Sequence, residues 1–292
     1  MKRKFLITLM ALSLILLGAG LVQADVLLSG TYLNVGVTDS GALCSTALGV
    51  GISQNNILAP NDWTIPGIPF EFYSIGVGGA WKAFGYPSAD SNPGGYTTTN
   101  VSSGTTLETI TSGPAFALGG ALLTYTQTVL YDMSENHVHI SMDLLNHGAT
   151  ITDVVLARGM DPDPNALNYG VYATTNTFVS HGVRAVGPVN GQTCTLEDNS
   201  IPMNGVAAIS GPAGGVWDTN PYDIIAGGLI NGAVAGNPLD YSINMAWMLP
   251  DLGSGQSFQI DMTYDFVPVP PSVYLLGTGL VGLLGLRRFR KR

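Results

Sequence analysis

The segment LLTYTQTVLY at Leu122–Tyr131, followed after a short turn by HVHISMDLLN at His137–Asn146, establishes the fold class. In the first run Thr124, Thr126 and Thr128 fall on one face, because successive side chains of a strand point to opposite faces. The second run alternates polar and apolar residues in the same way. This period of two is typical of half-buried antiparallel strands. The two runs therefore predict neighbouring strands with one face in a core.

Similar short runs, rich in Val, Ile, Thr and Tyr, recur from residue 25 to residue 266, and turn-forming residues interrupt them every few positions. Helical periodicity is nearly absent there. We therefore predict an all-β fold, a single large antiparallel β-sandwich, with a barrel as the second choice. Thr152–Asp163, coming directly after the quoted pair, predicts a meander of three consecutive strands. The expected strands are Val26–Val37, Phe70–Val77, Gly95–Ser102, Leu107–Thr111, Leu122–Tyr131, His137–Asn146, Ile151–Arg158, Thr174–Ser180, Val183–Gly187, Val206–Ser210, Tyr241–Met248 and Gln256–Phe266.

The N-terminus has the three parts of a secretory signal peptide. Lys2, Arg3 and Lys4 precede an apolar stretch, and Val22-Gln23-Ala24 places small residues before a cleavage site at Asp25. An uncleaved anchor helix is the alternative, although the apolar stretch is short for a membrane span. We expect residues 1–24 to form a signal helix and residues 25–266 to form the exported domain.

The C-terminus, residues 267–292, reads VPVPPSVYLLGTGLVGLLGLRRFRKR. Counted from Val267 to Leu286, it would rise about 30 Å as a helix, enough to cross a hydrocarbon core. The basic cluster that follows would stay in the cytoplasm. A buried terminal strand or helix is the alternative, but a buried end could not hold five cationic residues among its last six. We therefore expect a transmembrane helix here.

This tail resembles the PEP-CTERM sorting signal, in the variant with Val-Pro-x-Pro, an aromatic residue plus Leu, Gly-Thr-Gly-Leu and an Arg/Lys cluster. Val269 stands where the consensus signal has Glu. The resemblance implies a Gram-negative bacterial protein that is anchored transiently in the inner membrane. An exosortase, a membrane protease, would then release it to the cell surface or the extracellular matrix. The matching residues are Val267, Pro268, Pro270, Tyr274, Leu275, Gly277, Thr278, Gly279, Leu280, Gly282, Leu283, Gly285, Arg287 and Arg288.

The exported domain is much more acidic than the whole chain. Of the 11 Lys and Arg, three lie in the signal peptide and five in the tail, which leaves Lys82, Arg158 and Arg184 against 20 Asp and Glu, a formal charge of −17. Nucleic acid and anionic membrane surfaces are poor partners for such a domain, because binding them requires cations. Cations and neutral glycans are better suited to it.

Cys44 and Cys194 are the two cysteines of an exported chain, where oxidation is expected. We predict a disulfide between them, with two free thiols as the alternative. They do not form a metal motif, since two distant thiols without clustered His lack ligand spacing.

Asp161-Pro162-Asp163-Pro164-Asn165 spaces three oxygen-bearing side chains two residues apart. Hard cations such as Ca²⁺ bind oxygen ligands of this kind, so Asp161, Asp163 and Asn165 are a candidate Ca²⁺ site. The segment is not an EF-hand, because Ala166 and Tyr172 stand where Gly and Glu would be required. A rigid acidic turn without an ion is the alternative interpretation.

Glu135, His137 and His139 would share one face of a strand and could hold Zn²⁺. A solvated strand face is the favoured interpretation. Arg158 ends an apolar strand and is expected to pair with Asp161 or Asp163, with a role in binding a ligand as the alternative.

Trp81 and Trp217 lie beside Gly- and Pro-rich loops and are the two tryptophans expected to be exposed, where their rings could contact sugars. No Gly-x-Ser-x-Gly elbow, P-loop or His-Glu-x-x-His motif occurs. No residue is therefore assigned a catalytic role, and whether the protein is an enzyme stays open, with a non-enzymatic role favoured.

Within Leu122–Asn176, the order Thr-Gln-Thr, strand, Leu-Leu-Asn-His-Gly, strand, Arg-x-Met-Asp-Pro-Asp-Pro-Asn resembles the galactose-mutarotase-like superfamily. This resemblance implies a super-sandwich, meaning a very large two-sheet sandwich, and contact with carbohydrate. Three functions are therefore expected in order of preference. They are a structural or interaction protein within exopolysaccharide or biofilm, a lectin-like carbohydrate-binding module, and a carbohydrate-active enzyme.

Overall fold

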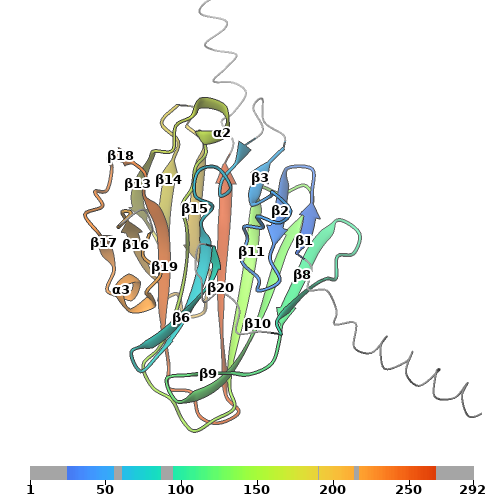
Figure 1. The fold of residues 1–292 in the computed structure, drawn as a ribbon, viewed down its shortest axis with the longest axis vertical. Helices are drawn as coiled ribbons and strands as arrows, with labels where there is room; N and C mark the ends of the chain where they lie inside the picture. The colour runs from blue at the N-terminus through green and yellow to red at the C-terminus, as the bar shows by residue number, and fades with distance from the viewer. Residues whose placement is uncertain (1–24, 56–60, 87–94, 190, 214–216, 268–292) are drawn as a thin grey trace, which may run out of the picture.

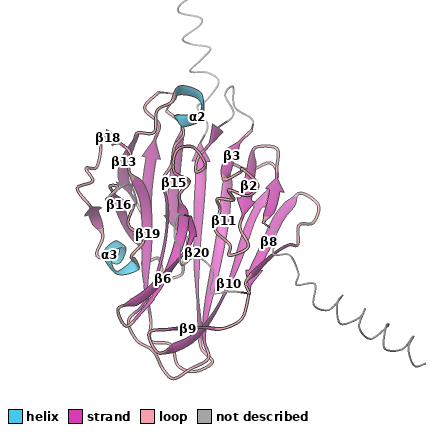
Figure 2. Cartoon of the chain, viewed as in Figure 1, coloured by secondary structure: helices cyan, strands magenta, loops and turns pink. Residues whose placement is uncertain are grey.

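A computed structural model describes residues 25–55, 61–86, 95–189, 191–213 and 217–267, and these residues form an all-β protein (Figure 2). The expected signal peptide, residues 1–24, and residues 268–292 of the expected sorting tail lie outside the described residues. Within the described residues, no helix combines the length and the apolar character that a membrane crossing requires. The predicted all-β fold class is confirmed for the described part of residues 25–266.

Two large sheets pack face to face, and a smaller sheet lies at one side (Figure 1). The ten-stranded sheet has the order β18 (Pro238–Leu239), β13 (Thr174–Val179), β14 (Gly182–Val186), β15 (Thr193–Asp198), β20 (Ser257–Val267), β11 (His137–Asn146), β10 (Ala121–Asp132), β8 (Thr106–Ser112) and β7 (Thr97–Asn100), and β9 (Phe116–Leu118) also pairs with β10.

The six-stranded sheet has the order β17 (Gly228–Ile230), β16 (Val206–Ser210), β19 (Ser242–Leu249), β12 (Val154–Met160), β5 (Glu71–Val77) and β6 (Ala80–Tyr86). The four-stranded sheet has the order β1 (Val26–Ser29), β2 (Leu33–Val37), β3 (Ile52–Gln54) and β4 (Asn61–Asp62). Two short helices occur among the described residues, α2 (Ala166–Tyr169) and α3 (Pro221–Ile225).

The core lies between the two large sheets and takes one face of each. Along β10, Leu123, Tyr125, Val129 and Tyr131 are buried, and the residues between them are partly or fully exposed, apart from the buried Gln127. Each fully buried side chain of this size stabilises the fold by about 1.5–3 kcal/mol relative to exposure. The alternation read from the sequence therefore identifies the core face of this strand.

The predicted three-strand meander is wrong at its third strand. β10 and β11 pair as expected, but the next neighbour of β11 is β20, and β12 crosses into the six-stranded sheet. The reason lies in burial. Every residue of β12 is buried, so this strand requires cover on both faces, whereas β11 alternates and requires it on one.

The outer face of the six-stranded sheet, which includes the second face of β12, is covered by side chains from outside the sheet. Phe72, Val155 and Ala157 point outward and pack beneath Trp217 and Ile224, the latter from α3.

The segment Val26–Val37, expected as one strand, forms β1 and β2, because the Gly30 N–H donates to the Leu33 carbonyl and turns the chain.

Candidate functional site

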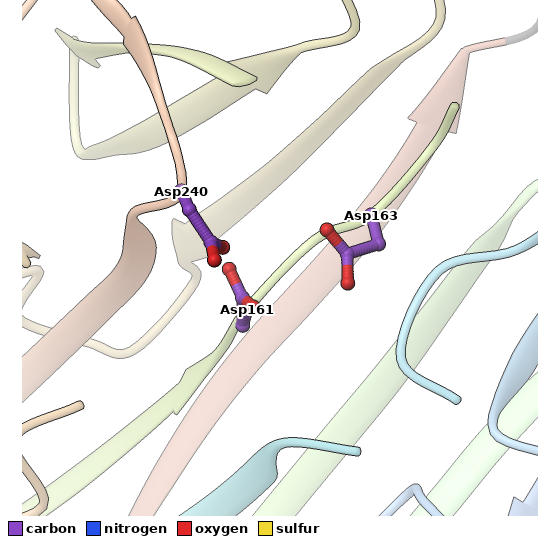
Figure 3. Close-up of side chains that lie close together, drawn as sticks. All are labelled: Asp161, Asp163 and Asp240. Carbon is purple, nitrogen blue, oxygen red and sulfur yellow. The ribbon is translucent and has the colours of Figure 1, made fainter. Parts of the chain in front are cut away.

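Three carboxylates from two distant parts of the chain lie close together (Figure 3). Asp161 and Asp163 follow β12, and Asp240 stands between β18 and β19. One carboxylate oxygen from each of the three can be chosen so that all lie within 4.8 Å of one another. In Figure 3 the side chains of Asp161 and Asp240 point toward each other, and Asp163 lies further along the same segment as Asp161.

The backbone holds this segment in place by a pattern that its sequence dictates. The N–H of Asp161 donates to the Phe70 carbonyl (3.1 Å) and the N–H of Asp163 donates to the Trp63 carbonyl (2.8 Å). Pro162 and Pro164 alternate with these residues and have no N–H to satisfy. The segment can therefore be fully buried without leaving unpaired backbone donors at the two prolines.

The carboxylates themselves are not fully satisfied by the described residues. Asp161 and Asp163 are each only 2% exposed, yet one oxygen of each has no hydrogen-bond donor there, and the same is true of one oxygen of the half-buried Asp240. Both salt bridges found among the described residues lie elsewhere, in Glu135–His137 and Glu71–Arg158. Buried carboxylates without a cation or a donor are costly, so this site requires protons or a bound cation.

Asp62 shows what a satisfied buried carboxylate looks like in the same protein. Its oxygens accept hydrogen bonds from the backbone N–H groups of Gly51 (2.9 Å), Thr64 (3.0 Å) and Ile65 (3.0 Å). Burial raises its pKa, and these hydrogen bonds act in the opposite direction. Within the described ranges the cluster of three carboxylates has no comparable set of donors, which separates it from an ordinary structural aspartate.

In the absence of a cation the cluster retains protons. Burial, together with the negative charges of Asp163 and Asp240, raises the pKa of Asp161 well above its ordinary value. Burial and the charge of Asp240 raise the pKa of Asp163 to about 9. Asp161 and Asp240 share a side-chain hydrogen bond, which requires a proton on one of them. A divalent cation would displace these protons.

The chemistry of the site suits a hard cation. It offers oxygen ligands only, from carboxylates that can bind in monodentate or bidentate fashion, as Ca²⁺ prefers. Asn165, expected as the third ligand, lies on the same segment, but its Oδ1 accepts a hydrogen bond from the Val189 N–H (3.0 Å). The third carboxylate of the cluster is Asp240, and Asn165 stays a predicted ligand. No pattern in the sequence points to Asp240, because its proximity depends on how β18 and β19 meet β12.

Arg158 lies in the core rather than at this site, and its expected pairing with Asp161 or Asp163 is wrong. Its Nε donates to Oε1 of Glu71 (2.6 Å), and its Nη1 donates to Oε1 of Gln127 (2.7 Å). Arg158 and Glu71 are both fully buried. Arg158 therefore cannot reach an external ligand in this structure.

The two tryptophans expected to be exposed have different environments. Trp81 on β6 is 39% exposed, as expected. Trp217 is only 5% exposed, since it packs on Phe70 with ring centroids 5.0 Å apart and its Nε1 donates to the Asp240 carbonyl (3.4 Å). Its apolar ring is needed to cover the outer sheet face, so the expectation for Trp217 is wrong. Because Trp217 lies beside Asp240, a change at the carboxylate cluster should alter the surroundings of the Trp217 ring.

The predicted disulfide is also absent, because Cys44 and Cys194 are free, buried thiols in separate surroundings. The Cys44 thiol donates to the Thr64 carbonyl (3.7 Å), and the Cys194 thiol lies 3.9 Å from the Met160 sulfur. Burial raises the pKa of both thiols. Loop spacing in the sequence could not reveal that the fold keeps the two apart.

Oε2 of Glu135 lies 3.1 Å from Nε2 of the partly exposed His137, and His139 Nδ1 hydrogen-bonds Thr263 Oγ1 (3.0 Å). The His137 and His139 rings contact each other edge to face, with centroids 4.7 Å apart, so the three side chains lie side by side on a partly exposed strand face. Of the expected sorting residues, Val267 ends β20. Pro268, Pro270, Tyr274, Gly277, Gly279, Arg287 and Arg288 lie outside the described residues.

No protein family and no curated protein sequence matches this chain. Solved structures do align with it. A bacterial glucoamylase complexed with acarbose aligns with a TM-score of 0.47 and 9% identity over 89% of this chain and 34% of its own. An α-N-acetylgalactosaminidase from Bifidobacterium bifidum aligns with 0.46 and 13% over 84% of this chain and 36% of its own. A putative aldose 1-epimerase from Escherichia coli K12 aligns with 0.43 and 12% over 84% and 99%.

This chain thus spans about a third of the two glycosidases and nearly all of the epimerase. All three TM-scores lie below 0.5. The similarity therefore assigns neither an activity nor a ligand to this chain, and only the chain's own residues can indicate them.

Proposed function

We propose that this protein is an exported, Ca²⁺-binding protein with a structural or interaction role in extracellular polysaccharide. The observation that carries the proposal is the cluster Asp161, Asp163 and Asp240, with its buried oxygens that no donor among the described residues satisfies. A cation would satisfy these oxygens and reduce the excess negative charge of the exported domain. Catalysis is less well supported, because two of the three carboxylates are 2% exposed and cannot readily meet a substrate.

Bound Ca²⁺ is expected to stabilise the fold. Excess Ca²⁺ should raise the melting temperature of the full chain relative to EDTA, because a cation that binds only the folded state stabilises it by about 2.7 kcal/mol at a hundredfold excess over Kd. Asp161→Asn and Asp163→Asn should remove the shift. Asp251→Asn changes the charge equally at an exposed position and should retain it. Identical melting of the wild-type chain in Ca²⁺ and EDTA would contradict ion binding.

The route out of the cell is proposed from the two ends of the chain. Residues 1–24 would direct export, and residues 267–292 would hold the protein in the inner membrane until an exosortase-type protease releases it. Deleting Pro268–Arg292 should abolish membrane retention and processing, and it should leave every residue of β20 in place. Cell fractionation measures the result, with Arg184→Met as a control that removes a cation outside the tail. Unchanged fractionation and size on deletion would refute the sorting role.

A further inference from the structure

An exposed apolar rim lies beside the carboxylate cluster. Its side chains come from the segment after Asn165 and from two loops that approach that segment. Their exposed fractions all exceed 40%, which is high for large apolar residues close to buried neighbours. The rim consists of Ile68, Leu167, Tyr169, Tyr172 and Val189.

One residue of this rim, Tyr172, lies close to the cluster. A Cβ added to Gly67 would lie 2.9 Å from Cε1 of Tyr172 and 3.6 Å from Oδ2 of Asp163. The Tyr172 ring and the Asp163 carboxylate are therefore at most 6.5 Å apart, the sum of these two distances. Gly67 has a φ of 76°, a value that favours glycine, and because glycine has no Cβ the Tyr172 ring can lie against it.

Backbone contacts to Asn165 hold other parts of the rim near the segment Asp161–Asn165. Gly170 caps the C-terminus of α2, and its left-handed φ of 65° turns the chain back so that Val171 bridges to Asn165. The Val189 N–H donates to the Asn165 side chain. Tyr169 and Tyr172 thus stand on either side of one tight turn, at the end of the molecule where α2 lies in Figure 1.

We propose that Tyr172 and Tyr169 form a binding platform for a neutral polysaccharide, beside the Ca²⁺ site. This inference deepens the proposed carbohydrate-associated role and rests on it. An exposed tyrosine offers an apolar ring face and a hydroxyl group, which match the C–H face and the hydroxyls of a pyranose. Trp217 is buried and cannot offer such a ring face, whereas Trp81 is exposed as predicted but does not belong to this rim.

The negative charge of the exported domain favours binding of a neutral polymer over an acidic one. The exported domain has only three cationic side chains, and Arg158 is fully buried in its ion pair with Glu71. Even with Ca²⁺ bound, three ionised carboxylates leave the cluster at a net charge of −1. A polyuronate or a nucleic acid would be repelled, whereas a neutral chain of hydroxyl groups would not.

The test is the migration of the full chain, in detergent, through native gels that contain a soluble β-glucan, an α-glucan or a galactomannan. We expect retardation in at least one gel. Tyr172→Ala should weaken that binding about fivefold or more, since an aromatic contact is worth about 1 kcal/mol. Tyr172→Phe keeps the ring and should bind nearly as well. Trp81→Ala is the matched control, because Trp81 is similarly exposed and follows the turn between β5 and β6, where the Gly79 N–H donates to the hydroxyl of Tyr222 in α3. In Figure 1, α3 lies apart from α2.

Melting in Ca²⁺ and EDTA, measured for each variant, separates the two proposals. If the wild-type chain shows the Ca²⁺ shift but no neutral gel retards it, the platform is refuted and ion binding stands. Retardation that Tyr172→Ala does not weaken, or retardation by alginate alone, also refutes the platform. Retardation lost in Tyr172→Ala and kept in Tyr172→Phe supports it, whatever the response to Ca²⁺. A Tyr172→Ala chain that still melts cooperatively shows that the lost binding is not a loss of folding.

Discussion

Replacing Arg158 by methionine is expected to lower the free energy of unfolding by about 3–5 kcal/mol. The substitution leaves Glu71 fully buried without its counter-charge. Burial raises the pKa of Glu71, and the charge of Arg158 is the main influence that opposes the rise. Equilibrium unfolding of the full chain in guanidinium chloride measures the loss.

The loss should be mostly one of charge balance rather than of contacts. The double variant Glu71→Gln/Arg158→Met removes both charges, so it should recover a large part of the stability that Arg158→Met loses. Arg184→Met is the matched control at an exposed position and should change stability by about 0.5 kcal/mol or less. If Arg158→Met unfolds at the wild-type denaturant concentration, the buried pair is not a main determinant of the fold.

The same network explains how the two large sheets are joined. Glu71 and Arg158 lie on β5 and β12 of the six-stranded sheet, whereas Gln127 and Tyr264 lie on β10 and β20 of the ten-stranded sheet. Arg158 donates across the core to Gln127, and the Tyr264 hydroxyl lies 3.3 Å from Oε1 of Glu71. The polar contacts therefore fix how one sheet sits on the other, in addition to the apolar core.

In EDTA, the protein is expected to become more stable as the pH falls from about 8 to 5. The folded-state pKa of Asp163 is about 9, and that of the unfolded chain is near 3.8, so between these values the folded state binds more protons. Stability then decreases with rising pH by about 1.4 kcal/mol per pH unit for each such group. The sign is opposite to that of an ordinary salt-bridged aspartate. Denaturant midpoints measured across this pH range test it.

Comparison of variants isolates the contribution of the cluster from that of the other acidic residues. Asp163→Asn cannot titrate, so its stability should depend less steeply on pH, and in EDTA at pH 8 it should be more stable than the wild-type chain. Asp251→Asn, at an exposed site, should keep the wild-type slope. Equal slopes for the wild-type chain and Asp163→Asn would mean that Asp163 is ionised in the folded protein, and its proposed protonation would then be ruled out.

The sequence was informative where a pattern is local. The alternation in β10 and β11 predicted both strands and their pairing, because the two faces of an antiparallel strand differ in exposure. It failed for β12, whose continuous apolar run does not indicate which sheet it joins. β15 was not expected at all, although it lies between β14 and β20 in the ten-stranded sheet.

For the candidate site too, the sequence was informative only about residues that are close together along the chain. Asp161 and Asp163 are close in sequence, and their spacing singled them out as candidate cation ligands that the structure places in one cluster of carboxylates. Asp240 and the Glu71 partner of Arg158 depend on contacts between distant strands, which one sequence does not contain. The exposure of Trp217 was misjudged for a related reason, since its neighbour Phe70 comes from a remote segment.

Calorimetric titration of the full chain with Ca²⁺ at pH 7, in two buffers of different protonation enthalpy, is the decisive experiment for the carboxylate cluster. We expect one bound Ca²⁺ with release of about one proton or more, because Asp161 and Asp163 retain protons until the cation arrives. Asp240→Asn should weaken the binding strongly. The absence of any binding heat in both buffers, or binding that Asp163→Asn and Asp240→Asn leave unchanged, would show that the cluster is not a Ca²⁺ site.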